Sequence, residues 1–299
     1  MITVSSLTKT YAGFTAVDDV SFTAQTGRVT GFLGPNGAGK STTMRIMVGL
    51  TPASTGTALI DGRRFVDLPN PGAEVGVLLD ASAQHAGRTG REILTIAQRT
   101  MGLPKSRVRE MLDLVSLTDT EAERRVRNYS LGMRQRLGLA TALLGDPHVL
   151  ILDEPANGLD PAGIRWMRDL LRGYADQGGT VLLSSHLLHE IEVIADDLVV
   201  IGNGRIVAQG TKADLLATAG TVARAADAVA LASAVERGGH TVTVHADNSI
   251  HTDATTDQVG QAALAAGVAL TELRGADGAG LEDMFLELTA DTQREGVAA

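Results

Sequence analysis

The chain has 299 residues, of which 44% are hydrophobic and 20% are charged, as in an ordinary globular protein. Lys and Arg number 26 against 35 Asp and Glu, and this net charge of -9 argues against a protein that binds nucleic acid through a basic surface. The chain has no cysteine, which excludes disulfides, thiolate metal sites and cysteine nucleophiles. Its length suits one domain of a little over two hundred residues and a smaller second domain.

The sequence also predicts where in the cell the protein lies. No segment approaches the roughly 20 uninterrupted apolar residues of a membrane-spanning helix. The N-terminus lacks the basic region and apolar stretch of a secretory signal. We therefore expect a cytoplasmic protein that does not itself span a membrane.

The first half of the chain begins with β-like segments and continues with helices. Three short strands are expected before a glycine-rich loop, at residues 2–7, 20–24 and 28–33. Apolar residues at helical spacing then predict a short helix from Lys40. Residues 55–80 are β-like again, and residues 84–145 are mostly helical. Within them Ser106 is expected to be the N-cap of one helix, and another helix is expected over 132–144.

The next segment predicts a parallel sheet. The run 149–152 is apolar without polar alternation, which is typical of a strand buried on both faces. Asp160 is then expected to cap a helix whose first residue is Pro161. Residues 180–184 form a further buried strand, and residues 198–208 form a hairpin around a Gly-Asn-Gly turn. Strands alternating with helices predict an α/β fold.

The composition changes after residue 210, where alanine-rich helices and short strands begin. Their expected order is β, α, β, β, α, β, which is the split βαβ pattern of a ferredoxin-like unit. The six segments are 221–225, 226–238, 240–247, 249–253, 255–267 and 268–274. A last helix is expected over 281–288. The sequence thus predicts two domains, 1–210 and 211–299.

A phosphate-binding loop is the strongest motif. It matches G-x-x-x-x-G-K-[ST] as Gly34-Pro35-Asn36-Gly37-Ala38-Gly39-Lys40-Ser41, between a predicted strand and a predicted helix. Glycines let backbone N–H groups converge on a phosphate at a helix N-terminus. Lys40 would reach the β- and γ-phosphates, the Ser41 hydroxyl would bind Mg²⁺, and the adjacent Thr42 belongs to the same nucleotide site. The sequence therefore predicts a nucleoside triphosphate site.

Two carboxylates follow the buried strand 149–152. Asp153 would hold Mg²⁺ through water, and Glu154 would polarise the water that attacks the phosphate. The carboxyl ends of parallel strands are where ligands bind in such sheets. A solvated pair that merely ends a strand is the alternative, and the phosphate loop makes it much less favourable.

At this point the chain resembles the ATP-binding cassette (ABC) family, because further motifs follow in that family's order and at its spacings. Tyr129-Ser130-Leu131-Gly132-Met133 resembles the signature L-S-G-G-Q, keeping Ser130 and Gly132. In the family this segment closes over the γ-phosphate of the opposite subunit. An ordinary helix N-cap is the alternative reading of Ser130. The resemblance covers about residues 2–210 and implies a P-loop NTPase cassette with a helical subdomain over about 84–145.

The resemblance to the ABC family implies roles for three further residues. Asp160, in Asn157-Gly158-Leu159-Asp160, corresponds to the D-loop, although a plain N-cap reading is equally good and compatible with it. His186 corresponds to the switch histidine that contacts the γ-phosphate and Glu154; a structural histidine is the alternative. Tyr11 occupies the position of an aromatic residue that stacks on adenine, against the alternative of simple packing.

The chain departs from the family at one functional position. The Q-loop glutamine, which touches Mg²⁺ or water and couples to the membrane partner, is replaced by Asp80. A carboxylate can also hold a metal or bind water, but it adds negative charge and is shorter. Gln84 is nearby and is not given this role.

The resemblance implies an ATP-hydrolysing subunit of an ABC transporter that uses ATP and Mg²⁺, with export as the favoured direction. Residues 281–289 resemble the end of cassettes serving drug, antibiotic or polysaccharide exporters. The expected partners are a second copy of the chain and a separate integral membrane permease that contacts residues 84–125; no nucleic acid is expected. The chain would then lie on the inner face of the cell membrane through the permease.

The sequence leaves two alternative functions. A soluble cassette acting on ribosomes or DNA is one, but such proteins generally carry two cassettes or a long coiled coil, and this chain has one phosphate loop and no sustained heptads. A catalytically silent binding module is the other. The presence of Lys40, Asp153, Glu154 and His186 argues against it.

Overall fold

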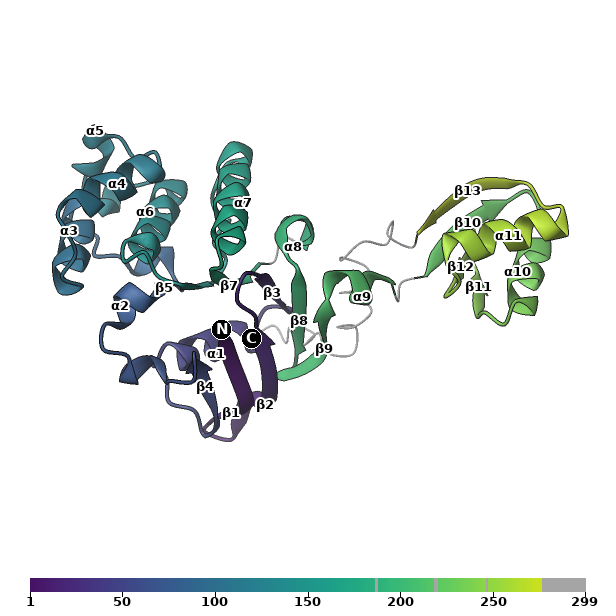
Figure 1. Ribbon diagram of the computed structural model, residues 1–299, viewed down its shortest axis with the longest axis horizontal. Helices are drawn as coiled ribbons and strands as arrows, with labels where there is room; N and C mark the ends of the chain where they lie inside the picture. The colour runs from purple at the N-terminus through teal and green to yellow at the C-terminus, as the bar shows by residue number, and fades with distance from the viewer. Residues whose placement is uncertain (186–187, 218–219, 246, 276–299) are drawn as a thin grey trace, which may run out of the picture. The chain divides into compact units, whose positions relative to one another are not determined.

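The computed structural model describes residues 1–185, 188–217, 220–245 and 247–275. These residues form two compact units, one over Met1–Gln209 and one over the described part of Gly210–Asp291 (Figure 1). Within the described ranges, none of the helices has the length and apolar character needed to cross a bilayer.

The first unit contains a small antiparallel sheet ordered β2-β1-β4. Its strands are β1 (Ile2–Tyr11), β2 (Phe14–Ala24) and β4 (Thr55–Ile60). The first two are longer than predicted, because a two-residue turn joins them directly. Both turn residues have positive φ, 41° at Ala12 and 89° at Gly13, the conformation that suits the twist of a tight hairpin.

A six-stranded sheet forms the centre of the first unit, in the order β5-β6-β7-β3-β8-β9. Its strands are β3 (Val29–Leu33), β5 (Val75–Leu78), β6 (Val149–Leu152), β7 (Thr180–Ser184), β8 (Asp197–Gly202) and β9 (Arg205–Thr211). The pairs from β5 to β8 are parallel. Every residue of β6 is fully buried, which confirms the prediction made from its unbroken apolar run. The β8–β9 hairpin turns at Asn203 and Gly204, both with positive φ, as predicted.

Helices pack around this sheet. They are α1 (Lys40–Met47), α2 (Pro71–Glu74), α3 (Gly90–Thr100), α4 (Ser106–Leu114), α5 (Asp119–Ala122), α6 (Leu131–Leu143), α7 (Pro161–Asp176) and α8 (Leu188–Ile194). Figure 1 shows α3, α4, α5 and α6 gathered in one helical group. The glycine at 138 lets α6 approach β5 closely, since a Cβ there would lie 2.6 Å from Leu78 Cδ1.

Two local predictions in this region were wrong. Residues 65–74 are not β-like: they contain a 3₁₀ turn (Phe65–Asp67) and α2, which Pro71 begins. Ser106 is not an N-cap, because it is already the first residue of α4. The chain turns one step earlier, since Pro104 accepts a hydrogen bond from the N–H of Arg107 and Lys105 already has helical backbone angles.

The second unit is a four-stranded antiparallel sheet ordered β11-β12-β10-β13, with two helices and a core of its own. Its elements in chain order are β10 (Thr221–Ala225), α10 (Ala228–Arg237), β11 (Val242–Val244), β12 (Ser249–Thr252), α11 (Thr256–Ala266) and β13 (Leu270–Gly275). This order confirms the predicted ferredoxin-like pattern. A short helix, α9 (Lys212–Ala217), precedes it. The helix expected over 281–288 lies outside the described residues.

Candidate functional site

The glycine-rich loop joins β3 to α1, as the motif requires. Gly39 is the N-cap of α1 with a φ of +111°, and a Cβ there would lie 2.6 Å from the Ala16 carbonyl oxygen, so only glycine fits. The first-turn N–H groups of α1 follow directly and carry the positive end of the helix dipole. The loop therefore provides a backbone site for an anion such as a phosphate.

Lys40 is the first residue of α1 and is 7% exposed. Its Nζ donates to the carbonyl oxygens of Gly34 at 2.5 Å and Pro35 at 3.3 Å. Burial lowers the pKa of Lys40 from its usual value, while the carboxylates of Glu154 and Asp153 act in the opposite direction. A buried ammonium held by weak neutral acceptors is ready to exchange them for phosphate oxygens.

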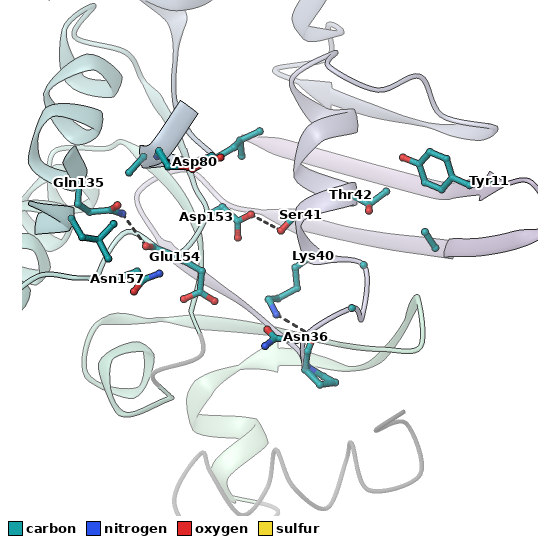
Figure 2. Close-up of a pocket in the computed structure, with 18 of the residues that line it drawn as sticks. Tyr11, Asn36, Lys40, Ser41, Thr42, Asp80, Gln135, Asp153, Glu154 and Asn157 are labelled. Carbon is teal, nitrogen blue, oxygen red and sulfur yellow. Dashed lines mark hydrogen bonds between the residues drawn. The ribbon is translucent and has the colours of Figure 1, made fainter. Parts of the chain in front are cut away.

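Asp153 and Glu154 lie directly after β6, at the carboxyl edge of the parallel sheet. Ser41 Oγ donates to Asp153 Oδ2 at 2.6 Å, so the phosphate loop and the acidic pair meet (Figure 2). Ser184, at the end of β7, donates a short hydrogen bond to Asp153 Oδ1. The same hydroxyl accepts the N–H of Glu154 at 3.0 Å. Side chains from α1 and β7 thus fix the Asp153 carboxylate, and Ser184 also holds the main chain of Glu154.

A cavity of about 640 Å³ opens over this edge. Most of the predicted site residues line it: Tyr11, Pro35, Asn36, Gly37, Gly39, Lys40, Ser41, Thr42, Asp80, Asp153 and Glu154 (Figure 2). Gly34 and Ala38 belong to the same loop but do not line the cavity. Its volume falls within the range of small-molecule sites. The phosphate loop and the acidic pair therefore share one pocket in a single chain.

The remaining predicted residues lie elsewhere. Ser130 is the N-cap of α6 and accepts the N–H of Met133 at 3.2 Å, and Gly132 lies in the first turn of that helix. Asp160 is the N-cap of α7 and accepts the N–H of Gly163 at 2.8 Å. Ser130, Gly132 and Asp160 do not line the cavity of their own chain, although Leu131 and Asn157 of the same two segments do. His186 lies outside the described residues.

Tyr11 ends β1 and is 45% exposed, which argues against the packing alternative. The Lys9 ammonium lies 4.8 Å from the centre of its ring. Phe14 is its direct partner across the β1–β2 turn and lines the same cavity. The cavity therefore has an aromatic end, opposite in character to the polar end at Asp153.

Asp80 follows β5 and lines the cavity, as expected of a residue in the Q-loop position. Its Oδ1 accepts hydrogen bonds from the Ser82 N–H at 2.7 Å and the Ser82 hydroxyl at 2.6 Å. These bonds hold the pKa of Asp80 below its ordinary value, so the side chain is ionised at neutral pH. Gln84 does not line the cavity and donates to the Arg134 carbonyl oxygen at 3.2 Å.

Sequence reasoning missed two residues that hold this site. Ser184 received no role, although a hydroxyl that ends an apolar strand is a signal for such a residue. Gln135 is the second residue. It is 3% exposed, lines the cavity and donates to the Glu154 carbonyl oxygen at 2.9 Å. The sequence signal for Gln135 is a polar side chain one turn into a helix that the sequence predicts.

Comparisons with known proteins agree with this geometry. The family model for ABC transporters matches residues 17–157. An ABC transporter ATP-binding protein of Bacillus subtilis, YhcH, is 43% identical over 69% of this chain and 68% of its own length. The bacitracin transport protein BcrA of Bacillus licheniformis is 39% identical with the same coverage of each chain. The daunorubicin/doxorubicin resistance protein DrrA of Streptomyces peucetius is 38% identical over 74% of this chain and 68% of its own length.

Solved structures show the same fold. An ATP-binding subunit of an ABC transporter superposes with a TM-score of 0.66 at 29% identity, over 72% of this chain and 91% of that one. A dimeric bacterial ABC transporter cassette superposes with a TM-score of 0.65 at 22% identity, over 71% and 98% of the two chains. The phosphate loop, the acidic pair and these relatives lead to one conclusion: the chain belongs to the ATP-binding proteins of ABC transporters, a family of ATPases.

Proposed function

We propose that this chain is the ATP-hydrolysing subunit of an ABC exporter, working as a pair of copies with a separate membrane permease. The observation that carries the ATPase role is the convergence of Lys40, Ser41, Asp153 and Glu154 on one cavity. Export is supported by relatives named for bacitracin transport, lantibiotic transport and Nod factor export. The names of these relatives favour transport over a role on ribosomes or DNA.

In the proposed mechanism the phosphate loop binds the phosphates of ATP. Lys40 exchanges its bonds to Gly34 and Pro35 for the β- and γ-phosphate oxygens. Tyr11 contacts the adenine at the aromatic end of the cavity. The nucleotide would then extend from β1 to the carboxyl end of β6, with its γ-phosphate beside Glu154. Catalysis consists mainly of positioning and electrostatic stabilisation.

The donor atoms at the polar end fit Mg²⁺. Ser41 Oγ and Asp153 Oδ2 lie 2.6 Å apart, and Asp80 lines the same cavity. Hard oxygen donors suit this ion, and nucleotide sites supply one or two carboxylates while the phosphates complete the shell. Among the described residues no cluster of three His, Asp or Glu side chains forms a metal cage, which agrees with an ion held jointly with ATP. When bound, Mg²⁺ would neutralise charge on the phosphates.

Glu154 is proposed to be the general base. Its main chain is fixed by β7 and α6, and its carboxylate lines the cavity. There it would accept a hydrogen bond from water and orient that water toward the γ-phosphate. His186 is proposed to contact the same phosphate and Glu154.

The proposed assembly contains two copies of the chain. Ser130 and Gly132 would then face the nucleotide of the second copy, which is consistent with their position outside the cavity of their own chain. ATP-binding subunits of this family dimerise and work with membrane permeases, and residues 84–125 are the proposed contact with the permease. We further propose residues 1–210 as the ATPase domain and residues 211–299 as an accessory domain.

Replacing Glu154 by Gln tests the ATPase mechanism. We expect steady-state turnover, measured as phosphate release, to fall roughly 10²–10⁴-fold, because the amide cannot accept the proton. ATP affinity should persist. The control is Glu123→Gln, which removes an exposed glutamate paired with Arg91 outside the cavity and should leave turnover unchanged. Near wild-type turnover of Glu154→Gln would contradict the assignment.

The transport role requires a separate test. A tagged chain purified from solubilised membranes should bring an integral membrane protein with it. Recovery with ribosomes and without a membrane protein would favour the regulatory alternative and contradict the exporter.

A further inference from the structure

Glu154 has a backbone conformation that is uncommon for a glutamate. Its φ is +51°, in the left-handed region that favours glycine. A residue keeps such a conformation only when its surroundings fix it, and residues of this kind gather at functional sites. The fixing groups around Glu154 are therefore candidates for a role in the reaction.

The main chain of Glu154 is held at both ends by buried side chains. Its N–H donates to Ser184 Oγ at 3.0 Å. Its carbonyl oxygen accepts from Gln135 Nε2 at 2.9 Å (Figure 2). The N–H of Asn157 also donates to this oxygen at 3.1 Å, which closes the turn after the strand. Ser184 additionally binds Asp153, whereas Gln135 donates to Glu154.

Gln135 is well suited to impose a geometry. It is 3% exposed and comes from α6, while Glu154 follows β6 in the central sheet. Its amide thus joins α6 to the turn that follows β6. Removing this donor takes one hydrogen bond from the Glu154 carbonyl, which would keep the bond from the Asn157 N–H. The left-handed turn at Glu154 would then lose one of the contacts that oppose relaxation.

We propose that Gln135 is a positioning residue for ATP hydrolysis, whose amide holds the Glu154 main chain so that the carboxylate faces the attacking water. This inference rests on the general-base role proposed above for Glu154. Because Ser130, which is proposed to face the second copy, is the N-cap of α6, the same bond links the placement of that helix to the geometry of the base. Gln135 itself touches neither the water nor the proton.

The first test is Gln135→Met in the full chain, which keeps the length and volume of the side chain but removes the donor. We expect kcat for ATP hydrolysis to fall roughly 10- to 100-fold, the cost of a small misplacement of a reacting group. The KM for ATP should stay within about twofold, because the phosphate loop is unchanged. A kcat within about twofold of wild type would overturn the proposal.

Gln98→Met is the matched control. Gln98 is 6% exposed, lies in α3 and donates to the Leu103 carbonyl oxygen, so it too is a buried glutamine bound to a main-chain carbonyl. It does not line the cavity. We expect Gln98→Met to lose about as much thermal stability as Gln135→Met. Its kcat should nevertheless stay within about twofold of wild type. Equal losses of kcat in the two variants would indicate a general structural effect and overturn the proposal.

A double-mutant cycle shows whether Gln135 acts through Glu154. In a Glu154→Gln chain the base is already absent, so adding Gln135→Met should lower kcat by less than about twofold. A further loss as large as that of the single variant would overturn the proposal. If Glu154→Gln alone retains wild-type turnover, the proposed base itself is wrong. If only Gln135→Met retains it, the base stands and the positioning role is wrong.

Gln135→Glu provides a second variant should the Met variant not fold. The side chain keeps its shape, but an ionised carboxylate cannot donate to the Glu154 carbonyl, whereas a protonated one can. The kcat of this variant relative to wild type should therefore rise as the assay pH is lowered. A ratio that is independent of pH would overturn the proposal.

Discussion

At the scale of single residues, Asp80 is the most informative departure from the family. It lines the cavity, and the resemblance assigns it to the position of the Q-loop glutamine. The Ser82 N–H and hydroxyl both donate to its Oδ1. Those hydrogen bonds hold the pKa of Asp80 below its ordinary value, so the cavity carries a further negative charge at neutral pH. Such a charge would favour a divalent cation and disfavour free phosphate. We therefore interpret Asp80 as an additional, water-mediated contact to Mg²⁺.

This interpretation predicts the behaviour of Asp80→Asn. The amide oxygen can still accept from Ser82, so the turn is retained while the charge is lost. We expect the Mg²⁺ concentration for half-maximal ATP hydrolysis to rise roughly 10-fold, the lower end of the range for loss of an outer-shell metal contact. Asp80→Gln, which restores the family's residue, should behave similarly. An unchanged Mg²⁺ requirement in both variants would show that Asp80 only caps its turn.

At the scale of elements, a carboxylate clip joins three parts of the first unit. Asp196 Oδ2 accepts the N–H of Val29, where β3 begins, and a bond from Arg172 Nη1 in α7, each at 2.8 Å. Asp196 itself immediately precedes β8. Burial alone would raise the pKa of Asp196, but the Val29 N–H and the Arg172 guanidinium outweigh burial and hold that pKa below its ordinary value. These bonds of Asp196 therefore stabilise the starts of β3 and β8, which are parallel neighbours in the sheet.

The lowered pKa of Asp196 determines how the stability effect of Asp196→Asn depends on pH. Because the carboxyl pKa is lower in the folded state, the stabilising contribution of Asp196 is complete above the unfolded pKa of about 3.9 and is lost as the pH falls through the folded pKa. We expect Asp196→Asn to lower the free energy of unfolding at pH 7 by about 1–2 kcal/mol. The difference from wild type should shrink as the pH falls below about 4. Urea denaturation followed by the fluorescence of Trp166, which lies in α7, measures it.

Asp176→Asn is the control for this clip. Asp176 pairs with the same Arg172 at 2.9 Å but its side chain is 63% exposed, so its loss should cost less than about 0.5 kcal/mol. Equal effects of the two substitutions, or an Asp196 effect that persists unchanged at about pH 3, would contradict the clip.

Elements also show what local sequence can predict. The apolar run of β6 identified a buried strand because burial on both faces removes polar alternation, and Asp160 with Pro161 identified the start of α7 because capping is local. The Ser106 cap was wrong because Pro104 starts the turn earlier. The contact of Gln135 with Glu154 could not be predicted at all, since it depends on the packing of α6 against the sheet.

At the scale of the whole molecule, one chain supplies an incomplete set of the predicted site residues. Its own cavity gathers the phosphate loop and the acidic pair, whereas Ser130 and Gly132 lie outside that cavity. A dimer in which each chain presents the start of its α6 to the partner's nucleotide would complete both sites. This arrangement predicts that two differently inactivated chains restore one complete site when mixed.

Lys40→Ala and Ser130→Asp make that experiment possible. The first removes the phosphate-binding ammonium; the second preserves the N-cap of α6 while placing a negative charge where it would repel a γ-phosphate. In a mixed dimer, one site carries both lesions and the other carries neither. Each variant alone should hydrolyse ATP at least roughly 10-fold more slowly than wild type, and an equimolar mixture should recover up to a quarter of wild-type turnover, because half the dimers are mixed and each has one intact site. If both residues instead served the nucleotide of their own chain, every site in the mixture would be defective, and turnover would not exceed the mean of the two variants.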